Sequence, residues 1–196
     1  MRQIIKKVIR EVLNENVYKD LILFHGSSDQ KIITKFYDNQ FYTVNDYIAS
    51  TYAYNFNGLM YEVKVKNLNS FELMDYNRYR QKDEHDKMVT LLSNLYNENV
   101  GREYERNYLS PSASSVFSAY GGWTPLIDWC KENGYDSIKF TDESFDVYIR
   151  DITYIIFDGN KPKITNIYEV GDAIESNFVK PFKKIKKTKW NLPPYS

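Results

Sequence analysis

Short apolar segments with strand character are spread along the whole chain, and they constrain the fold more than any other feature of the sequence. The clearest spans 59–65, where apolar and more polar side chains alternate, as expected for a strand with one buried face. Further strands are predicted at 21–24, 41–43, 71–74, 137–140, 153–157 and 163–168. Strands this short and this far apart favour an α+β domain, with two small packed sheets and flanking helices, over a doubly wound parallel sheet.

Helices are predicted between these strands. Apolar residues recur at helical spacing in 1–16 and in 84–98. Asn45 and Thr124 are the predicted N-caps of two further helices, of which the first carries Ile48, Ala49 and Tyr52 and the second ends at Gly134. We expect an N-terminal amphipathic helix at 1–18, one folded domain at 19–169 and a basic tail at 170–196, with a substrate-facing loop at 100–122.

Composition excludes several classes of protein. The net charge is zero, so the chain as a whole has no electrostatic bias towards nucleic acid or membrane. The lone Cys130 excludes an internal disulfide and a cysteine-based zinc site, and it fits a reducing compartment. No segment approaches the roughly 18 apolar residues that span a bilayer, and the N-terminus lacks a signal-peptide pattern. We expect a cytoplasmic protein without a membrane span and without a metal.

Residues suited to chemistry are concentrated in three motifs, while the glycine-rich phosphate-binding motifs of the Rossmann and P-loop folds are absent from the sequence. The motifs are Leu23-Phe24-His25-Gly26-Ser27; Phe41-Tyr42-Thr43, followed by a helix with Ala49 and Tyr52; and Tyr135-Asp136-Ser137-Ile138, followed by Tyr154-Ile155-Ile156-Phe157-Asp158.

In this order and context the three motifs resemble those of the ADP-ribosyltransferase superfamily. The branch concerned carries a His-Tyr-acid triad and includes diphtheria-type toxins, poly-ADP-ribose polymerases and phage enzymes. The resemblance covers about 20–74 and 124–168. It implies a split β-sandwich fold, NAD as the substrate, and transfer of single ADP-ribose units to a protein or nucleic acid. A toxin-like phage or bacterial effector acting in a host cytoplasm fits this reading.

The resemblance also implies roles for individual residues. His25 would hydrogen-bond a ribose hydroxyl of NAD, and Gly26 would let the backbone approach the nicotinamide amide. Tyr42 on the pocket strand and Tyr52 on the next helix would frame the nicotinamide ring. Ser27 and Thr43 belong to the same motifs and are expected on the NAD-binding surface. The competing interpretation makes His25 a core histidine and both tyrosines core aromatics of a Tyr-rich chain.

The catalytic acid is where the sequence departs from the family pattern. Thr153 stands directly before Tyr154, where the family commonly has Glu. Alternation places Asp151 on the same strand face as Thr153, so Asp151 is the candidate acid, with Glu143 and Asp146 as second choices. A chain without a catalytic acid is the remaining alternative. It would be an inactive relative that binds NAD or a partner, or a virion or scaffold protein that uses the fold for packing.

Six lysines and no acid lie between Lys180 and Lys189. One interpretation is a solvated terminus. The other is an arm that contacts the phosphates of a nucleic-acid acceptor, with Phe182 and Trp190 stacking on bases.

Deleting residues 179–196 distinguishes these interpretations. If the lysines contact phosphates, deletion weakens nucleic-acid binding and flattens its salt dependence, because fewer counterions are released. Binding would be measured by fluorescence anisotropy with a labelled oligonucleotide over a salt series. An unchanged slope removes the nucleic-acid arm.

Overall fold

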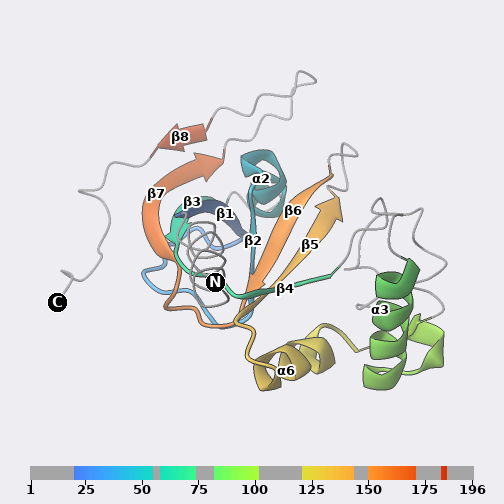
Figure 1. The fold of residues 1–196 in the computed structure, drawn as a ribbon. Helices are drawn as coiled ribbons and strands as arrows, with labels where there is room; N and C mark the ends of the chain where they lie inside the picture. The colour runs from blue at the N-terminus through green and yellow to red at the C-terminus, as the bar shows by residue number, and fades with distance from the viewer. Residues whose placement is uncertain are drawn as a thin grey trace, which may run out of the picture.

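The computed structural model describes residues 20–54, 58–73, 82–101, 121–143, 150–170 and 182–184. The expected helix at 1–16 and most of the expected loop at 100–122 lie outside these ranges. The strands are β1 (Leu21–Ser27), β2 (Gln40–Thr43), β3 (Leu59–Val65), β4 (Ser70–Glu72), β5 (Ser137–Glu143), β6 (Arg150–Ile156), β7 (Lys163–Val170) and β8 (Phe182–Lys184); the helices are α2 (Asp46–Tyr54), α3 (Lys82–Leu95) and α6 (Thr124–Glu132) (Figure 1).

The strands form one mixed sheet of eight, in the order β4-β5-β6-β2-β1-β3-β7-β8. Only the β4–β5 pair is parallel. The α+β class is therefore confirmed, and each strand predicted from the sequence is present. We expected two separate sheets, but hydrogen bonding connects all eight strands. The connection between β1 and β2 is narrow, because its ladder has a single pair, Phe24 with Thr43.

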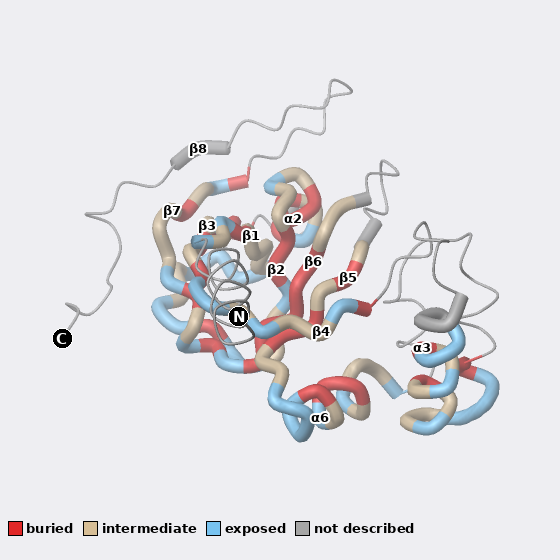
Figure 2. The backbone as a smooth tube through the Cα atoms, viewed as in Figure 1, coloured by how far each residue is buried: buried red, intermediate tan, exposed pale blue. Residues whose placement is uncertain are grey.

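Side chains alternate between the two faces of this sheet, and each face has its own cover. The helix face carries Phe24, Gly26, Phe41, Thr43, Thr153 and Ile155, and the loop face carries Leu23, His25, Tyr42, Tyr61 and Tyr154. Helix α2 packs on the helix face over β1, and α6 packs near β5 (Figure 1). The 28–39 loop covers the loop face through Ile32, Ile33 and Phe36. Buried positions run through β2 and β6 between these layers (Figure 2).

Of the two N-caps predicted from the sequence, the structure confirms one. Asn45 caps α2 as predicted, since its Oδ1 accepts hydrogen bonds from the backbone N–H groups of Tyr47 (2.9 Å) and Ile48 (3.2 Å). The prediction for Thr124 is wrong, because Trp123 is the N-cap of α6 and provides no side-chain cap. Pro125 in the first turn sets the start of this helix instead. Gly134 follows α6 with a φ of 80°, the left-handed conformation that stops a helix.

The end of the sheet differs from the sequence interpretation of 170–196 as a tail. Strand β8 lies within that range and pairs antiparallel with β7, with Val170 opposite Phe182 and Tyr168 opposite Lys184. A strand of three residues that contains two lysines has no apolar alternation to reveal it, and lysine is common on edge strands. Within the part of the chain that the structure describes, no helix has the length and apolar character needed to cross a membrane.

Gly26 lets α2 lie directly against β1. A Cβ atom built at Gly26 would be 1.9 Å from the carbonyl oxygen of Ala49. This oxygen belongs to the α2 backbone, so no side-chain rotation relieves the clash. Any larger residue at position 26 forces the helix away from the strand.

We therefore expect Gly26→Ala to lower the free energy of unfolding by about 3 kcal/mol, at the upper end of typical overpacking costs. Gly134→Ala is the control, because nothing lies within 4 Å of its added methyl group. It should cost only the backbone strain of a left-handed residue, about 1 to 2 kcal/mol. Urea denaturation measures both, and an equal cost for the two variants would contradict the close helix–strand contact.

Candidate functional site

His25 lies where β1 and β2 separate. It is one residue beyond the only ladder pair of the two strands, and its Nδ1 is 2.8 Å from the carbonyl oxygen of Phe41. A carbonyl only accepts, so Nδ1 carries the hydrogen in the neutral ring and Nε2 is left as an acceptor. The imidazole thus has a defined orientation and one nitrogen able to accept a hydrogen bond from a hydroxyl.

The environment of His25 keeps the ring neutral. Burial lowers the pKa of His25 below its ordinary value of 6.5, and the hydrogen bond to Phe41 opposes this shift only in part. The neighbouring groups are aromatic rings, whose centroids lie 5.2 Å (Phe36), 5.3 Å (Tyr42) and 6.4 Å (Tyr61) from that of the imidazole. A neutral imidazole in such a place binds hydroxyl groups rather than phosphates.

Tyr42 contacts His25 but is a core side chain. It is 1% exposed and belongs to the apolar cluster on the loop face, together with Leu23, Tyr61 and Tyr154. Its hydroxyl has no hydrogen-bond partner among the described residues. Burial raises the pKa of Tyr42 far above its ordinary value, so the phenol stays protonated. This geometry supports the competing interpretation of Tyr42 as a core aromatic and leaves one hydroxyl unsatisfied beside the imidazole.

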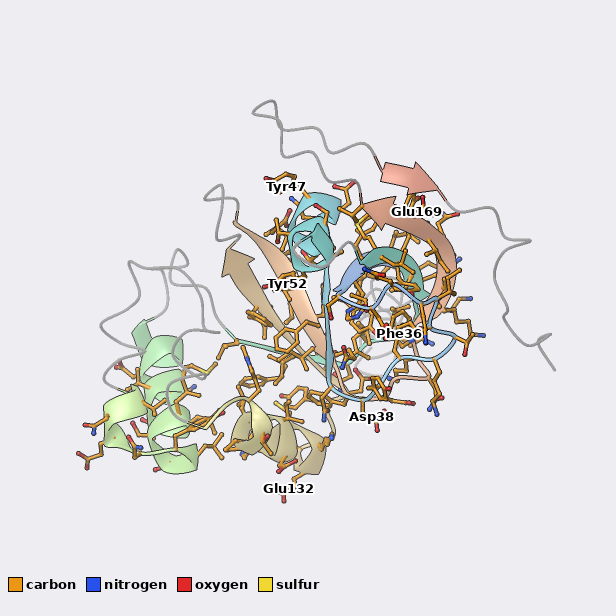
Figure 3. The ribbon with its side chains drawn as sticks, turned by 180° about the vertical axis from the view of Figure 1, so that it is seen from behind. Phe36, Asp38, Tyr47, Tyr52, Glu132 and Glu169 are labelled. Carbon is orange, nitrogen blue, oxygen red and sulfur yellow. The ribbon has the colours of Figure 1, made fainter. Side chains whose placement is uncertain are left out.

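Tyr52 lies on the other face of the sheet. The Cβ of Tyr52 is 3.0 Å from a Cβ built at Gly26, on the side of β1 that α2 covers. Phe36 belongs to the apolar cluster on the loop face, so Tyr52 and Phe36, both labelled in Figure 3, come from different faces of the sheet. Tyr52 is 47% exposed. The start of the Tyr52 side chain and the backbone of Ala49 therefore both pack against Gly26 on the helix face.

The two hydroxyl residues of the motifs make local hydrogen bonds. Thr43 Oγ1 donates to the carbonyl of Ile152 (3.2 Å) and accepts from the N–H of Asn45 (3.2 Å). Ser27 Oγ accepts from the N–H of Asp29 (3.1 Å). Thr43 is buried and Ser27 is partly exposed. These contacts shape the ends of β1 and β2.

The candidate acid Asp151 is bound to the start of α2. Its Oδ2 accepts a hydrogen bond from Nδ2 of Asn45 (3.1 Å), and its Oδ1 accepts from the N–H of Ile152 (2.8 Å). Asn45 is the N-cap of α2, so Asp151 helps to fix this helix on β6. Asp151 shares the helix face with Thr153, as predicted, and His25 lies on the loop face. The side chain of Glu143 and the whole of Asp146 lie outside the described residues.

Thr153 occupies the position at which the resemblance implies an acid. It is 3% exposed, and its Oγ1 has no hydrogen-bond partner within the described ranges. Its strand neighbours are Thr43 on β2 and Phe140 on β5. A buried hydroxyl without a partner is costly, so a ligand group that reached it would find an available donor and acceptor.

The structure sorts the predicted residues into two groups. His25 and Tyr42 lie together on the loop face, and Gly26, Thr43, Tyr52 and Asp151 lie on the helix face. The two groups come close where β1 and β2 separate. There the imidazole of His25, on the loop face, is hydrogen-bonded to the backbone of Phe41, and the side chain of Phe41 lies on the helix face.

Sequence reasoning missed three residues next to these groups. Phe36 packs edge-on against His25 and Tyr42, at 5.2 Å and 5.5 Å between ring centroids. Phe41 and Trp123 contact each other on the helix face at 5.9 Å. Side chains alternate along a strand, so the sequence alone predicts that Phe41 and Tyr42 point to opposite faces. The contact with Trp123, 82 positions later, could not be predicted in this way.

Comparison of the chain with protein-family models, with curated proteins and with solved structures gave no match. Among the residues that the structure describes, no group of three or more His, Cys, Asp or Glu is placed to hold a metal ion. The geometry of the site is therefore the basis for a functional proposal.

The environment of His25 predicts a pH dependence of stability. Because the folded-state pKa lies below 6.5, the unfolded chain takes up a proton at a higher pH than the folded chain. The contribution of His25 is complete above pH 6.5 and is lost as pH falls through the folded-state pKa.

We expect the free energy of unfolding of the wild type to fall more steeply below pH 6.5 than that of His25→Asn. Urea denaturation at a series of pH values measures both slopes. His85→Asn, which changes the only other histidine, should retain the wild-type slope. Parallel curves for the wild type and His25→Asn would show that His25 is not buried in its neutral form.

Proposed function

We propose that this protein is an NAD-dependent mono-ADP-ribosyltransferase. The observation that carries the proposal is the orientation of His25, which is hydrogen-bonded through Nδ1 to Phe41 at the separation of β1 and β2. Nε2 is then the ring nitrogen that would accept a hydrogen bond from a ribose hydroxyl. Gly26 is the next residue along β1, and α2 carries Tyr52 against it on the helix face.

We also propose that the sheet forms a split β-sandwich. The single ladder pair between β1 and β2 divides the sheet into the halves β4-β5-β6-β2 and β1-β3-β7-β8. Side chains of both halves share one apolar cluster, with Tyr42, Tyr154 and Ile156 from one half and Tyr61, Val63 and Ile167 from the other. Two half-sheets that pack through a common core are what a split β-sandwich requires.

In the proposed reaction, the bond between the ribose C1′ and the nicotinamide nitrogen breaks, and its electron pair leaves with nicotinamide. A nucleophile of the acceptor forms the new bond to C1′ and loses its proton to solvent or to a nearby base. The site would contribute mainly by positioning, with His25 holding the ribose and Gly26 and Tyr52 holding the ring. The acceptor would be a protein, or a nucleic acid guided by the lysines of 180–190, inside a bacterial or host cytoplasm.

A second candidate is a domain that binds NAD without turnover. Both oxygens of Asp151 accept hydrogen bonds within the protein, one of them from the cap of α2, and Thr153 stands in place of an acid. This arrangement supplies a structural reason for Asp151 that does not involve catalysis. The virion or scaffold alternative predicts no NAD binding at all.

Nicotinamide release from NAD tests these candidates. We expect His25→Ala to lower the release rate about 100-fold, the scale of effect that misplacing a reacting group produces. Asp151→Asn removes the charge and keeps one acceptor oxygen, so one of the two hydrogen bonds of the carboxylate is lost. Asn45→Ala is the matched control, because it removes the contact with Asp151 and keeps the carboxylate. Release that falls in Asp151→Asn and not in Asn45→Ala, with both variants folded in a thermal melt, assigns the carboxylate to catalysis.

The remaining outcomes separate the candidates. NAD-dependent thermal stabilisation of the wild type without any nicotinamide release would replace the transferase by a binding domain. Release equal in the wild type and in His25→Ala would overturn the role of His25. Absence of both binding and release at millimolar NAD would overturn the proposed function and favour the scaffold.

A further inference from the structure

The half of the sheet that ends in β7 and β8 contains a carboxylate fixed by three donors. Glu62 on β3 accepts hydrogen bonds at Oε1 from Thr165 Oγ1 and Asn166 Nδ2, both at 2.7 Å. Its Oε2 accepts from the Tyr168 hydroxyl at 2.8 Å. The register shift between Glu62 and Val63 explains this convergence, because it leaves Thr165 as an extra residue of β7 next to Asn166. The negative charge of Glu62 is therefore held in place on the helix face, beside Tyr168.

Two further acids lie around this position. The pKa of Tyr168 is raised to about 12, first by burial and then by the hydrogen bond to Glu62 and the negative charges of Glu62 and Asp46. Asp46 belongs to the first turn of α2, so a second carboxylate acts on Tyr168 from the helix. Glu169, the next residue of β7, is exposed and by alternation points to the opposite face. We call Glu62, Asp46 and Glu169 the acidic edge.

Strand β8 brings the most basic part of the chain to the acidic edge. It pairs antiparallel with β7 at the end of the sheet, so that Lys183 lies opposite Glu169 and Lys184 lies opposite Tyr168 (Figure 1). Six lysines and no acid lie in the run 180–189, and β8 is part of this run. Opposite charges at facing positions of antiparallel strands stabilise the pair of strands. The register therefore sets a lysine-rich segment against an acidic strand.

We propose that the acidic edge is the docking site of the lysine-rich segment 180–190 of this same chain, and that β8 is the place where this segment joins the sheet. The charges of the two partners are complementary, and β8 already belongs to the segment. Docked in this way, the lysines cover the outer side of β7, and an anionic partner has to compete with the acidic edge for them. The proposal does not depend on the use of NAD.

Trypsin, which cleaves after lysine, measures this docking in the full-length protein. The cleavage rate within 183–189 is followed by mass spectrometry and compared with that of a synthetic peptide of residues 179–196. We expect slower cleavage in the protein than in the peptide at low ionic strength. At about 1 M salt, where the screening length is about 3 Å, the protection should be largely lost, and the peptide corrects for any effect of salt on trypsin.

A double variant removes two charges of the acidic edge and adds no site for trypsin. Asp46 and Glu169 are both exposed, and we expect Asp46→Asn with Glu169→Gln to be cleaved about fivefold faster within 183–189, the scale of two exposed ion pairs. The matched control is Asp128→Asn with Glu132→Gln, which changes two exposed acids of α6 and should be cleaved as the wild type. Glu169 and Glu132 are labelled in Figure 3. Thermal melts establish that both variants are folded.

Each alternative gives a different result. Cleavage as fast in the protein as in the peptide at low ionic strength would show a solvated terminus and overturn the docking. Protection that persists at high salt and in the double variant would show that backbone pairing of β8 alone holds the segment, which overturns the role of the acidic edge. Protection that appears only after a single-stranded oligonucleotide is added would assign the lysines to nucleic acid instead.

Discussion

The narrow connection between β1 and β2 is the constraint on which the rest of the structure depends. One ladder pair, Phe24 with Thr43, joins the two halves of an eight-stranded sheet. Beyond this pair the hydrogen bond from His25 to the Phe41 carbonyl and the contact between the His25 and Tyr42 rings connect the strands. Strands that separate leave backbone groups without ladder partners, and such groups are available to a ligand. The same separation brings residues of both sheet faces to one place.

Helix α2 depends on two anchors at its opposite ends. Asn45 caps its first turn and is held by Asp151 on β6, while the absence of a side chain at Gly26 lets its later residues lie on β1. The helix thereby bridges the two halves of the sheet. The candidate acid Asp151 therefore has a clear structural task here, because both of its oxygens accept hydrogen bonds that fix the start of α2 on β6.

The sequence predicted the elements of the fold better than their assembly. Alternation in 59–65 and the cap at Asn45 depend on local physics, and β3 and α2 form where they were expected. The continuity of the sheet depends on the Phe24–Thr43 pair, and β8 on edge pairing with β7, neither of which leaves a periodic pattern. In the site, the motifs placed Tyr42 on a strand and Tyr52 on a helix correctly. They did not show that the two side chains face apart, because this depends on which strand pairs with which.

The division of the site between two faces has a chemical consequence. On the loop face His25 is surrounded by aromatic rings, which exclude water and keep the imidazole neutral. On the helix face Tyr52 and Phe41 are 47% and 39% exposed. The loop face therefore holds an oriented, neutral imidazole among packed aromatic rings, and the helix face holds the more exposed aromatic side chains.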